Sequence, residues 1–134
     1  MRAAHRRANF GKNHQMSNNV YWLLELNIKD GEAENFKVLM NDMVEATKAN
    51  EPGTINYEWF VSDDGKHCHI YERFVNSAAT MTHLASFGEK FAERFLAALE
   101  PTRMVVYGDP SSEVREALVG FGAVHFEQVS GFAR

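Results

Sequence analysis

Residues 51–74 read EPGTINYEWFVSDDGKHCHIYERF, and this stretch decides the fold because it has the pattern of a β-hairpin. Asp64-Gly65 separates two runs of β-branched and aromatic residues, and type I′ turns favour this dipeptide because both central positions need positive φ. Taking Asp64-Gly65 as a two-residue loop predicts the cross-strand pairs Asp63–Lys66, Val61–Cys68, Trp59–Ile70 and Tyr57–Glu72. Residues directly opposite in such a pair share a face of the sheet.

This register sorts the hairpin side chains into two rows with different character. The first row is apolar except for one carboxylate: Ile55, Tyr57, Trp59, Val61, Cys68, Ile70, Glu72 and Phe74. The second row is mixed: Asn56, Glu58, Phe60, His67, His69, Tyr71 and Arg73. A slip of one residue would scramble the sorting, which supports the register. Glu72 is therefore the side chain that does not fit its row.

The segments around the hairpin predict a β-α-β-β-α-β order. Strands are expected at residues 20–28, 54–62, 66–74 and 103–108. The first helix is capped by Asp30 and runs to about Asn50, with apolar residues at helical spacing. The second starts at the Ser77 cap, breaks or kinks at Gly88 and is ended by Glu100-Pro101.

This order is typical of an α+β fold of the ferredoxin-like, split βαβ kind, an antiparallel sheet with helices on one face. Residues 1–19 are expected to be a flexible basic N-terminal tail, and residues 20–108 the folded domain. Residues 109–134 then add a C-terminal αβ extension of the same domain, with a helix at 113–121 and a strand at 123–129.

The second face of the predicted sheet is too apolar to face water in a monomer. It carries Tyr21, Leu23, Phe60, Tyr71, Val105 and Tyr107. A patch of this kind on a soluble protein marks an interaction surface. We therefore predict a homodimer in which the two mixed faces meet, forming a dimeric α/β barrel.

Charge and composition exclude several classes of function. The first sixteen residues hold four of the 14 Lys and Arg residues and none of the 18 Asp and Glu residues, so the body is acidic. Nucleic acid is therefore not an expected partner, because phosphate contacts need clustered cations. The sequence also lacks an apolar run of membrane-spanning length, and its single cysteine cannot form an intrachain disulfide. We expect a cytoplasmic protein with no membrane association.

The run EPGT-x-x-YEWF-x-S-x-DG, followed by ERF-x-NSAA and by His83, resembles the antibiotic biosynthesis monooxygenase family over about residues 20–108. The resemblance implies a dimeric ferredoxin-like fold with a pocket between sheet and helices. It also implies oxidation of a phenol or quinol-like substrate by O₂ without metal, haem or flavin. Haem-degrading relatives use an Asn, a Trp and a His where this chain has Leu24, Phe74 and His83, so only the His matches.

Glu72 and His83 are the candidate catalytic residues. A carboxylate on an apolar row is desolvated and suited to proton transfer, and an imidazole is the commonest proton carrier in enzymes. The structural alternatives are that Glu72 accepts a hydrogen bond from Tyr57 and that His83 bonds to a backbone carbonyl or solvent. Tyr57, Trp59 and Phe74 are the candidate substrate-binding residues, with plain core packing as their alternative.

A metal site is not expected, although His67 and His69 form an H-x-H pair. Only Glu58 shares their face, and a zinc site needs three or four convergent ligands. Cys68 lies on the apolar row and is predicted to be an inert buried thiol. We therefore predict a cofactor-independent monooxygenase acting on a small aromatic molecule. The alternative is a non-catalytic small-molecule-binding or stress-related dimer of the same fold.

Overall fold

The structure is a computed structural model that describes residues 17–134. Of the predicted N-terminal tail (residues 1–19), residues 1–16 therefore lie outside the described residues. The strands are β1 (Val20–Ile28), β2 (Thr54–Val61), β3 (His67–Phe74), β4 (Leu99–Gly108) and β5 (Val124–Phe126). The helices are α1 (Ala33–Asn50), α2 (Ser77–Lys90), α3 (Ala92–Ala98) and α4 (Ser112–Ala117), and a 3₁₀ turn, η2, covers Val119–Phe121.

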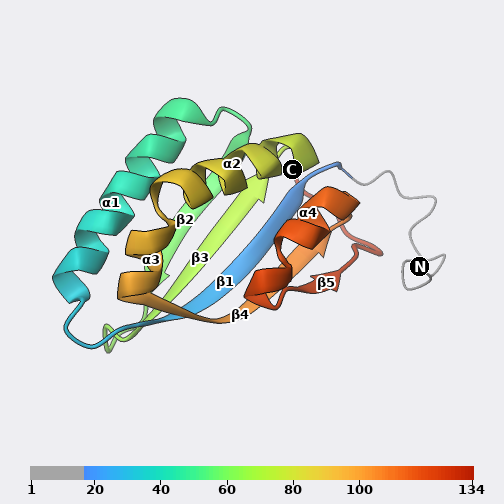
Figure 1. The fold of residues 1–134 in the computed structure, drawn as a ribbon. Coiled ribbons are helices and arrows are strands. Elements are labelled where there is room, and N and C mark those ends of the chain that lie inside the picture. Colours follow the sequence, from blue (N-terminus) through green and yellow to red (C-terminus); the bar gives the residue numbers. More distant parts are fainter. Residues whose placement is uncertain (1–16) are drawn as a thin grey trace.

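The strands form one sheet in the order β2-β3-β1-β4-β5. β1 pairs antiparallel with β3 and β4, and β2 pairs antiparallel with β3. β5 pairs in parallel with the outer edge of β4. Figure 1 shows the helices gathered on one face of this sheet. The predicted ferredoxin-like α+β fold is confirmed, and the C-terminal strand β5 extends the same sheet.

The core lies between the sheet and the helices. Alternate residues of β1 are buried, beginning with Val20 and Trp22, because successive strand side chains point to opposite faces. In α1 the buried residues recur at helical spacing: Phe36, Leu39, Met43 and Thr47. The buried residues of the strands and those of the helices thus form a single apolar layer.

The hairpin has the predicted register but a different turn. Tyr57 pairs with Glu72, Trp59 with Ile70 and Val61 with Cys68. Only Gly65 has positive φ, at 74°, so the turn is not the predicted type I′ with positive φ at both central residues. The Asp64 side chain instead accepts hydrogen bonds from the Lys66 N–H and the Ser62 hydroxyl. Ile55, assigned to the apolar row, lies at a register shift and is exposed.

The helix boundaries differ from the predictions at three points. Glu32 rather than Asp30 occupies the N-cap of α1. Asn76 rather than Ser77 caps α2, because its side chain accepts a hydrogen bond from the Ala79 N–H. The break between α2 and α3 falls at Phe91, and Gly88 lies inside α2.

Pro101 lies within β4 and does not simply end the preceding helix, so the strand begins earlier than predicted. A register shift between Glu25 and Leu26 accommodates this part of the strand. β5 pairs with β4 only at Val105–Tyr107, so Pro101 sits where the outer edge of β4 has no partner strand. Proline is tolerated at such edges because it has no N–H to donate.

The face of the sheet opposite the helices carries the mixed row. Tyr21, Leu23, Tyr71 and Tyr107 are half-buried, and Phe60 is exposed. Val105 was predicted to be exposed with them but is buried, because it lies between β1 and the added strand β5. The Arg73 guanidinium lies 4.2 Å from the centre of the Tyr21 ring.

Candidate active site

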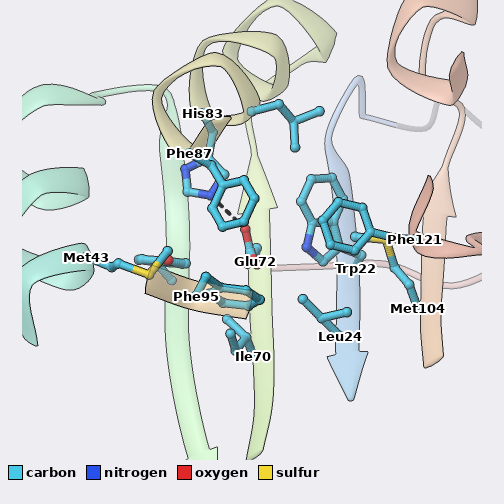
Figure 2. A pocket seen from close by; sticks show the side chains of 12 residues that line it. Trp22, Leu24, Met43, Ile70, Glu72, His83, Phe87, Phe95, Met104 and Phe121 are labelled. Carbon is cyan, nitrogen blue, oxygen red and sulfur yellow. Dashed lines mark ion pairs between the residues drawn. The ribbon is translucent and has the colours of Figure 1, made fainter. Parts of the chain in front are cut away.

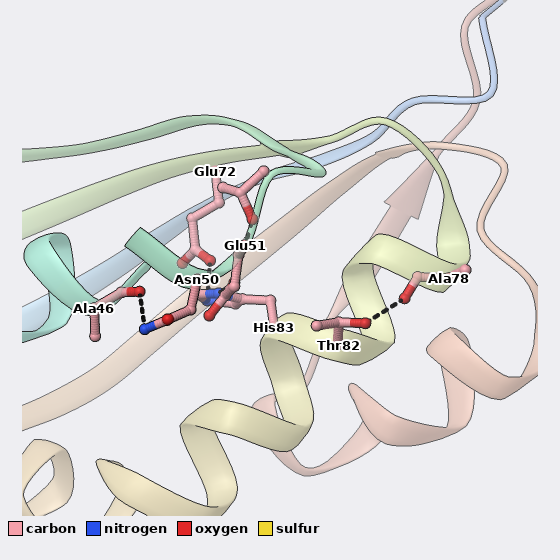
Figure 3. Close-up of polar contacts among 8 residues, drawn as sticks. Ala46, Asn50, Glu51, Glu72, Ala78, Thr82 and His83 are labelled. Carbon is pink, nitrogen blue, oxygen red and sulfur yellow. Dashed lines mark hydrogen bonds and ion pairs between the residues drawn. The ribbon is translucent and has the colours of Figure 1, made fainter. Parts of the chain in front are cut away.

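A buried histidine lies between two carboxyl groups beneath α2. His83 Nδ1 is 2.7 Å from Glu51 Oε1, and His83 Nε2 is 3.0 Å from Glu72 Oε1 (Figure 3). Each of the three side chains is less than a tenth exposed. Because buried charges are costly unless paired, this cluster (Glu51, Glu72 and His83) is the leading candidate for the functional site.

Close packing of α2 on the segment before β2 brings His83 and Glu51 together. Glu51 is the C-cap residue of α1, and Pro52-Gly53 turns the chain into β2. A Cβ atom at Gly53 would lie 2.6 Å from the Ala79 Cβ, so only glycine permits this approach. His83 is one helical turn beyond Ala79 and therefore faces the same segment.

The surroundings of His83 favour its charged form. Burial alone would lower the pKa of the imidazole, but the hydrogen bond to Glu51 and the contact with Glu72 outweigh it and raise the pKa to about 9. At neutral pH the ring is therefore an imidazolium, and both of its N–H groups point to carboxylates. Such a ring cannot accept another proton, so a general base in this cluster has to be a carboxylate.

Glu72 has an oxygen that is not fully engaged. Oε1 is within ion-pair distance of His83, yet it accepts no hydrogen bond of good geometry. Its cross-strand neighbours are Tyr57 on β2 and Trp22 on β1. Burial and the charge of Glu72 raise the pKa of the Tyr57 phenol, which stays protonated. Glu72 is thus a buried carboxylate with room for a further donor.

A small cavity lies directly beside the cluster, with a free volume of about 30 Å³. Figure 2 shows Glu72 and His83 on one side of it and Trp22 and Phe121 on the other. The lining residues are Trp22, Leu24, Met43, Tyr57, Ile70, Glu72, His83, Leu84, Phe87, Phe95, Met104 and Phe121. A volume of this size holds one or two water molecules.

Three of the five predicted site residues line this cavity, and two do not. Glu72 and His83 are in contact, and Tyr57 packs edge-on against the His83 ring, with 5.2 Å between ring centres. Trp59 packs instead against Phe36, Tyr57 and Phe95. Phe74 is fully buried between Trp22 and His83 and is not part of the cavity wall.

Sequence reasoning missed two residues of this site. Glu51 directly follows the predicted end of the first helix at about Asn50, and nothing in its local sequence separates it from a solvated acid. Trp22 lies in the first predicted strand and belongs to the core, and its indole nitrogen is buried without a partner. The predicted register could have placed Trp22 beside Glu72 had strand order been known.

Among the described residues, the histidines and the cysteine away from the cluster do not form a second candidate site. His67 Nδ1 lies 2.8 Å from Asn27 Oδ1 at the end of the hairpin. Within residues 17–134, no group of three or more potential ligands is arranged to hold a metal ion. Burial raises the pKa of the Cys68 thiol to about 12, which makes it a poor nucleophile. No helix in this range is long and apolar enough to cross a bilayer.

The sequence profile of the antibiotic biosynthesis monooxygenase family matches residues 20–100, more than half of the chain. The chain therefore belongs to this family. The match ends within β4, so it contains the whole Glu51–His83–Glu72 cluster and leaves out α4, η2 and β5. No curated protein sequence matches the chain.

Several solved structures share the fold. MupZ from Pseudomonas fluorescens is 22% identical with a TM-score of 0.79, covering 89% of this chain and 91% of its own. SnoaB from Streptomyces nogalater, a cofactor-independent oxygenase, is 14% identical with a TM-score of 0.59, covering 72% and 97%. A conserved protein from Methanosarcina mazei Go1 is 19% identical with a TM-score of 0.58, covering 66% and 90%. Of these three structures, MupZ matches the largest share of this chain.

Proposed function

We propose that this protein is a cofactor-independent monooxygenase that oxidises a small phenol or quinol-like aromatic substrate with O₂. The observation that carries the proposal is the buried Glu72 carboxylate, which has an incompletely engaged oxygen, contacts the charged His83 and borders an apolar cavity. Membership of the monooxygenase family and the fold shared with the oxygenase SnoaB support it.

In this proposal Glu72 removes the substrate proton. The phenolic O–H bond breaks, an O–H bond forms on Glu72, and the electron pair stays on the substrate as a phenolate. His83 is a positioning residue, since its imidazolium holds Glu72 in place and is itself held by Glu51. The apolar walls exclude water and strengthen these electrostatic interactions.

The anionic substrate then supplies all the electrons that oxygen needs. A phenol ring carbon that bears hydrogen loses it and gains one oxygen atom, and the second oxygen atom leaves as water. The products are a quinone and H₂O, so atoms and electrons balance without an external reductant. The protein's contribution is to create the anion and keep it beside O₂ in a dry site.

An aromatic substrate needs more space than the present cavity offers. Part of the cavity wall consists of aromatic rings, including Phe87 on α2 and Phe121 on η2, whose ring centres are 6.3 Å apart. Both rings are half-buried, and Phe87 packs edge-on against the buried Phe95, with 5.1 Å between ring centres. We infer that their displacement admits the substrate ring above Tyr57.

We also propose that the protein works as a homodimer. The support is the open face of the sheet, where Tyr21, Tyr71 and Tyr107 are half-buried and Phe60 is exposed. A second copy related by two-fold symmetry would cover this row with the same row. The active-site cluster lies on the helix side, so each subunit would keep its own cavity.

The second candidate is a protein of the same fold that binds a small molecule without changing it. The specific observation in its favour is the volume of about 30 Å³, which is too small for an aromatic ring without rearrangement. Under this alternative the cluster of Glu51, His83 and Glu72 holds α2 against the sheet, and its charged groups take no part in a reaction.

Oxygen uptake separates the two candidates. Metal-free protein mixed with a panel of hydroquinones is expected to consume O₂ and form quinones, followed by electrode and absorbance. Glu72→Gln keeps the shape but removes the base, and we expect it to lose on the order of 100-fold in kcat, the usual lower range for a general base. Glu58→Gln, an exposed acid on β2, is the matched control and is expected to retain full activity.

His83→Gln tests the positioning role in the same assay. Its neutral amide cannot supply an N–H at both ring-nitrogen positions and carries no charge, but Glu72 itself is retained, so we expect a smaller loss than in Glu72→Gln. Uptake that is absent with every substrate, or unchanged in Glu72→Gln, would exclude the enzymatic proposal and favour simple binding. Circular dichroism of each variant establishes that the fold is intact.

A further inference from the structure

Two buried polar atoms in the cavity wall are incompletely hydrogen-bonded. The Trp22 indole Nε1 carries a proton with no acceptor, and Glu72 Oε1 is an acceptor without a well-aligned donor. Both side chains are at most 5% exposed, and both line the same cavity. Unsatisfied buried polar atoms are uncommon in folded proteins, so a donor and an acceptor that share one cavity require an explanation.

The two atoms are brought together by the sheet. Trp22 on β1 and Glu72 on β3 are directly opposite in the antiparallel register, so their side chains emerge on the same face as neighbours. Figure 2 shows the indole nitrogen on the side of the Trp22 ring that faces Glu72. The donor and the acceptor therefore border the same small space.

We propose that Trp22 and Glu72 together bind the hydroxyl group of the substrate. Trp22 Nε1–H donates to the hydroxyl oxygen, and the hydroxyl proton is directed at Glu72 Oε1. This inference rests on the proposed function and deepens it, because it assigns the point of recognition. When Glu72 takes the proton, the Trp22 N–H remains hydrogen-bonded to the phenolate oxygen, where the negative charge develops.

The chemistry of the pair selects against other groups. A carbonyl or ether oxygen accepts from Trp22 but offers no proton to Glu72. A carboxylate ligand would be repelled by Glu72, and an ammonium group has no lone pair for the indole N–H. A hydroxyl satisfies both atoms at once, and the apolar remainder of the wall suits an aromatic ring behind it.

The chain offers a direct spectroscopic test because it contains only two tryptophans, Trp22 and Trp59. Both indole nitrogens are buried, but Trp59 is not part of the cavity wall. In a ¹⁵N–¹H spectrum, 4-fluorophenol is expected to shift the Trp22 indole signal downfield and leave the Trp59 signal in place. The probes 4-fluoroanisole and 4-fluorotoluene have similar rings but lack the hydroxyl.

Binding of the three probes is measured by ¹⁹F titration. We expect wild-type protein to bind 4-fluorophenol about tenfold more tightly than 4-fluorotoluene, and 4-fluoroanisole to fall between them. Trp22→Phe keeps an aromatic ring but removes the N–H, and should weaken 4-fluorophenol binding about fivefold. Trp59→Phe, the matched control, should change it by less than about twofold.

The outcomes distinguish this inference from the proposed function. Absence of 4-fluorophenol binding, or equal affinity for all three probes, overturns it, as does an unmoved Trp22 signal. A site that holds only water would give that unmoved signal. If phenol binding depends on Trp22 but no substrate consumes oxygen, the recognition site stands and the monooxygenase proposal fails. If Trp22→Phe does not fold, the probe affinities and the Trp22 signal of wild-type protein still test the proposed hydroxyl site.

Discussion

At the scale of single residues, the cluster of Glu51, His83 and Glu72 is an unusual thing to find in the core of a small domain. One imidazolium lies between two carboxyl groups in an apolar setting. Buried ion pairs seldom stabilise a protein more than apolar side chains of the same volume would. Their presence is therefore better explained by chemistry than by stability.

The raised pKa of His83 predicts how stability depends on pH. The folded value of about 9 exceeds the ordinary value of 6.5, so the folded state holds this proton more tightly. The resulting stabilisation is fully present below pH 6.5 and is lost as pH rises through 9. It amounts to roughly 3 kcal/mol. Urea unfolding of wild-type protein at pH 6 and pH 10 measures the loss.

His83→Gln is the control for this experiment. Burial raises the pKa of Cys68 to about 12 and also raises the pKa of Tyr57, so both groups destabilise the folded state at alkaline pH. These effects are shared by the variant and cancel in the comparison. We expect wild-type protein to lose roughly 3 kcal/mol more than His83→Gln between the two pH values. An equal loss would mean that His83 is neutral in the folded protein.

The three residues of this cluster differ in how readily they can be identified from the sequence alone. Glu72 stood out because it was the one acid on an otherwise apolar strand face. His83 was singled out by its place on the second helix and by the family resemblance. Glu51 could not be found in this way, because its burial depends on α2 packing across it, a contact between segments 32 positions apart.

At the scale of elements, the approach of α2 to the α1–β2 connection controls the site. Gly53 does not have positive φ, so the reason for glycine there is steric. Gly53→Ala would place a Cβ 2.6 Å from the Ala79 Cβ, and α2 has to move away. We expect a loss of about 1–3 kcal/mol in the free energy of unfolding, measured by urea titration. The His83 pKa, followed by NMR, should also fall because Glu51 becomes more distant.

Gly88→Ala makes the same substitution elsewhere in the structure. Gly88 lies inside α2 with open space where a Cβ would go, and its φ is not positive. Alanine should therefore stabilise the helix by about 0.5–1 kcal/mol and leave the His83 pKa unchanged. If both variants behave alike, close packing at Gly53 does not position the cluster.

The elements were predictable where a periodic pattern runs over many residues. The alternation in residues 54–74 was enough for the hairpin register, and the 3.6-residue spacing was enough for α1. Single glycine and proline residues were poorer guides to the ends of elements. Gly88 did not break α2, and Pro101 did not exclude a strand. In both places the packing of neighbouring elements outweighed the preference of one residue.

At the scale of the whole molecule, the helices cover only one face of the sheet. The opposite face exposes 53% of Phe60, and the segment after β4 adds Phe126 and Phe132, which are 54% and 76% exposed. Tyr21 and Tyr107 line a surface hollow of about 300 Å³ together with these C-terminal residues. An apolar surface of this extent is costly in water, and a second copy of the chain supplies a matching one.

The last prediction is therefore that an added charge in the middle of this face dissociates the proposed dimer. Tyr71 lies on β3 beside Tyr21, with 6.5 Å between ring centres, and Tyr71→Glu would bury an unpaired carboxylate on both sides of a two-fold interface. Light scattering should show twice the chain mass for wild-type protein and the mass of one chain for the variant. Val38→Glu adds the same charge at an exposed position of α1, on the helix side, and should remain dimeric. A wild-type monomer, or a dimer lost equally in both variants, would mean that the open face is not the interface.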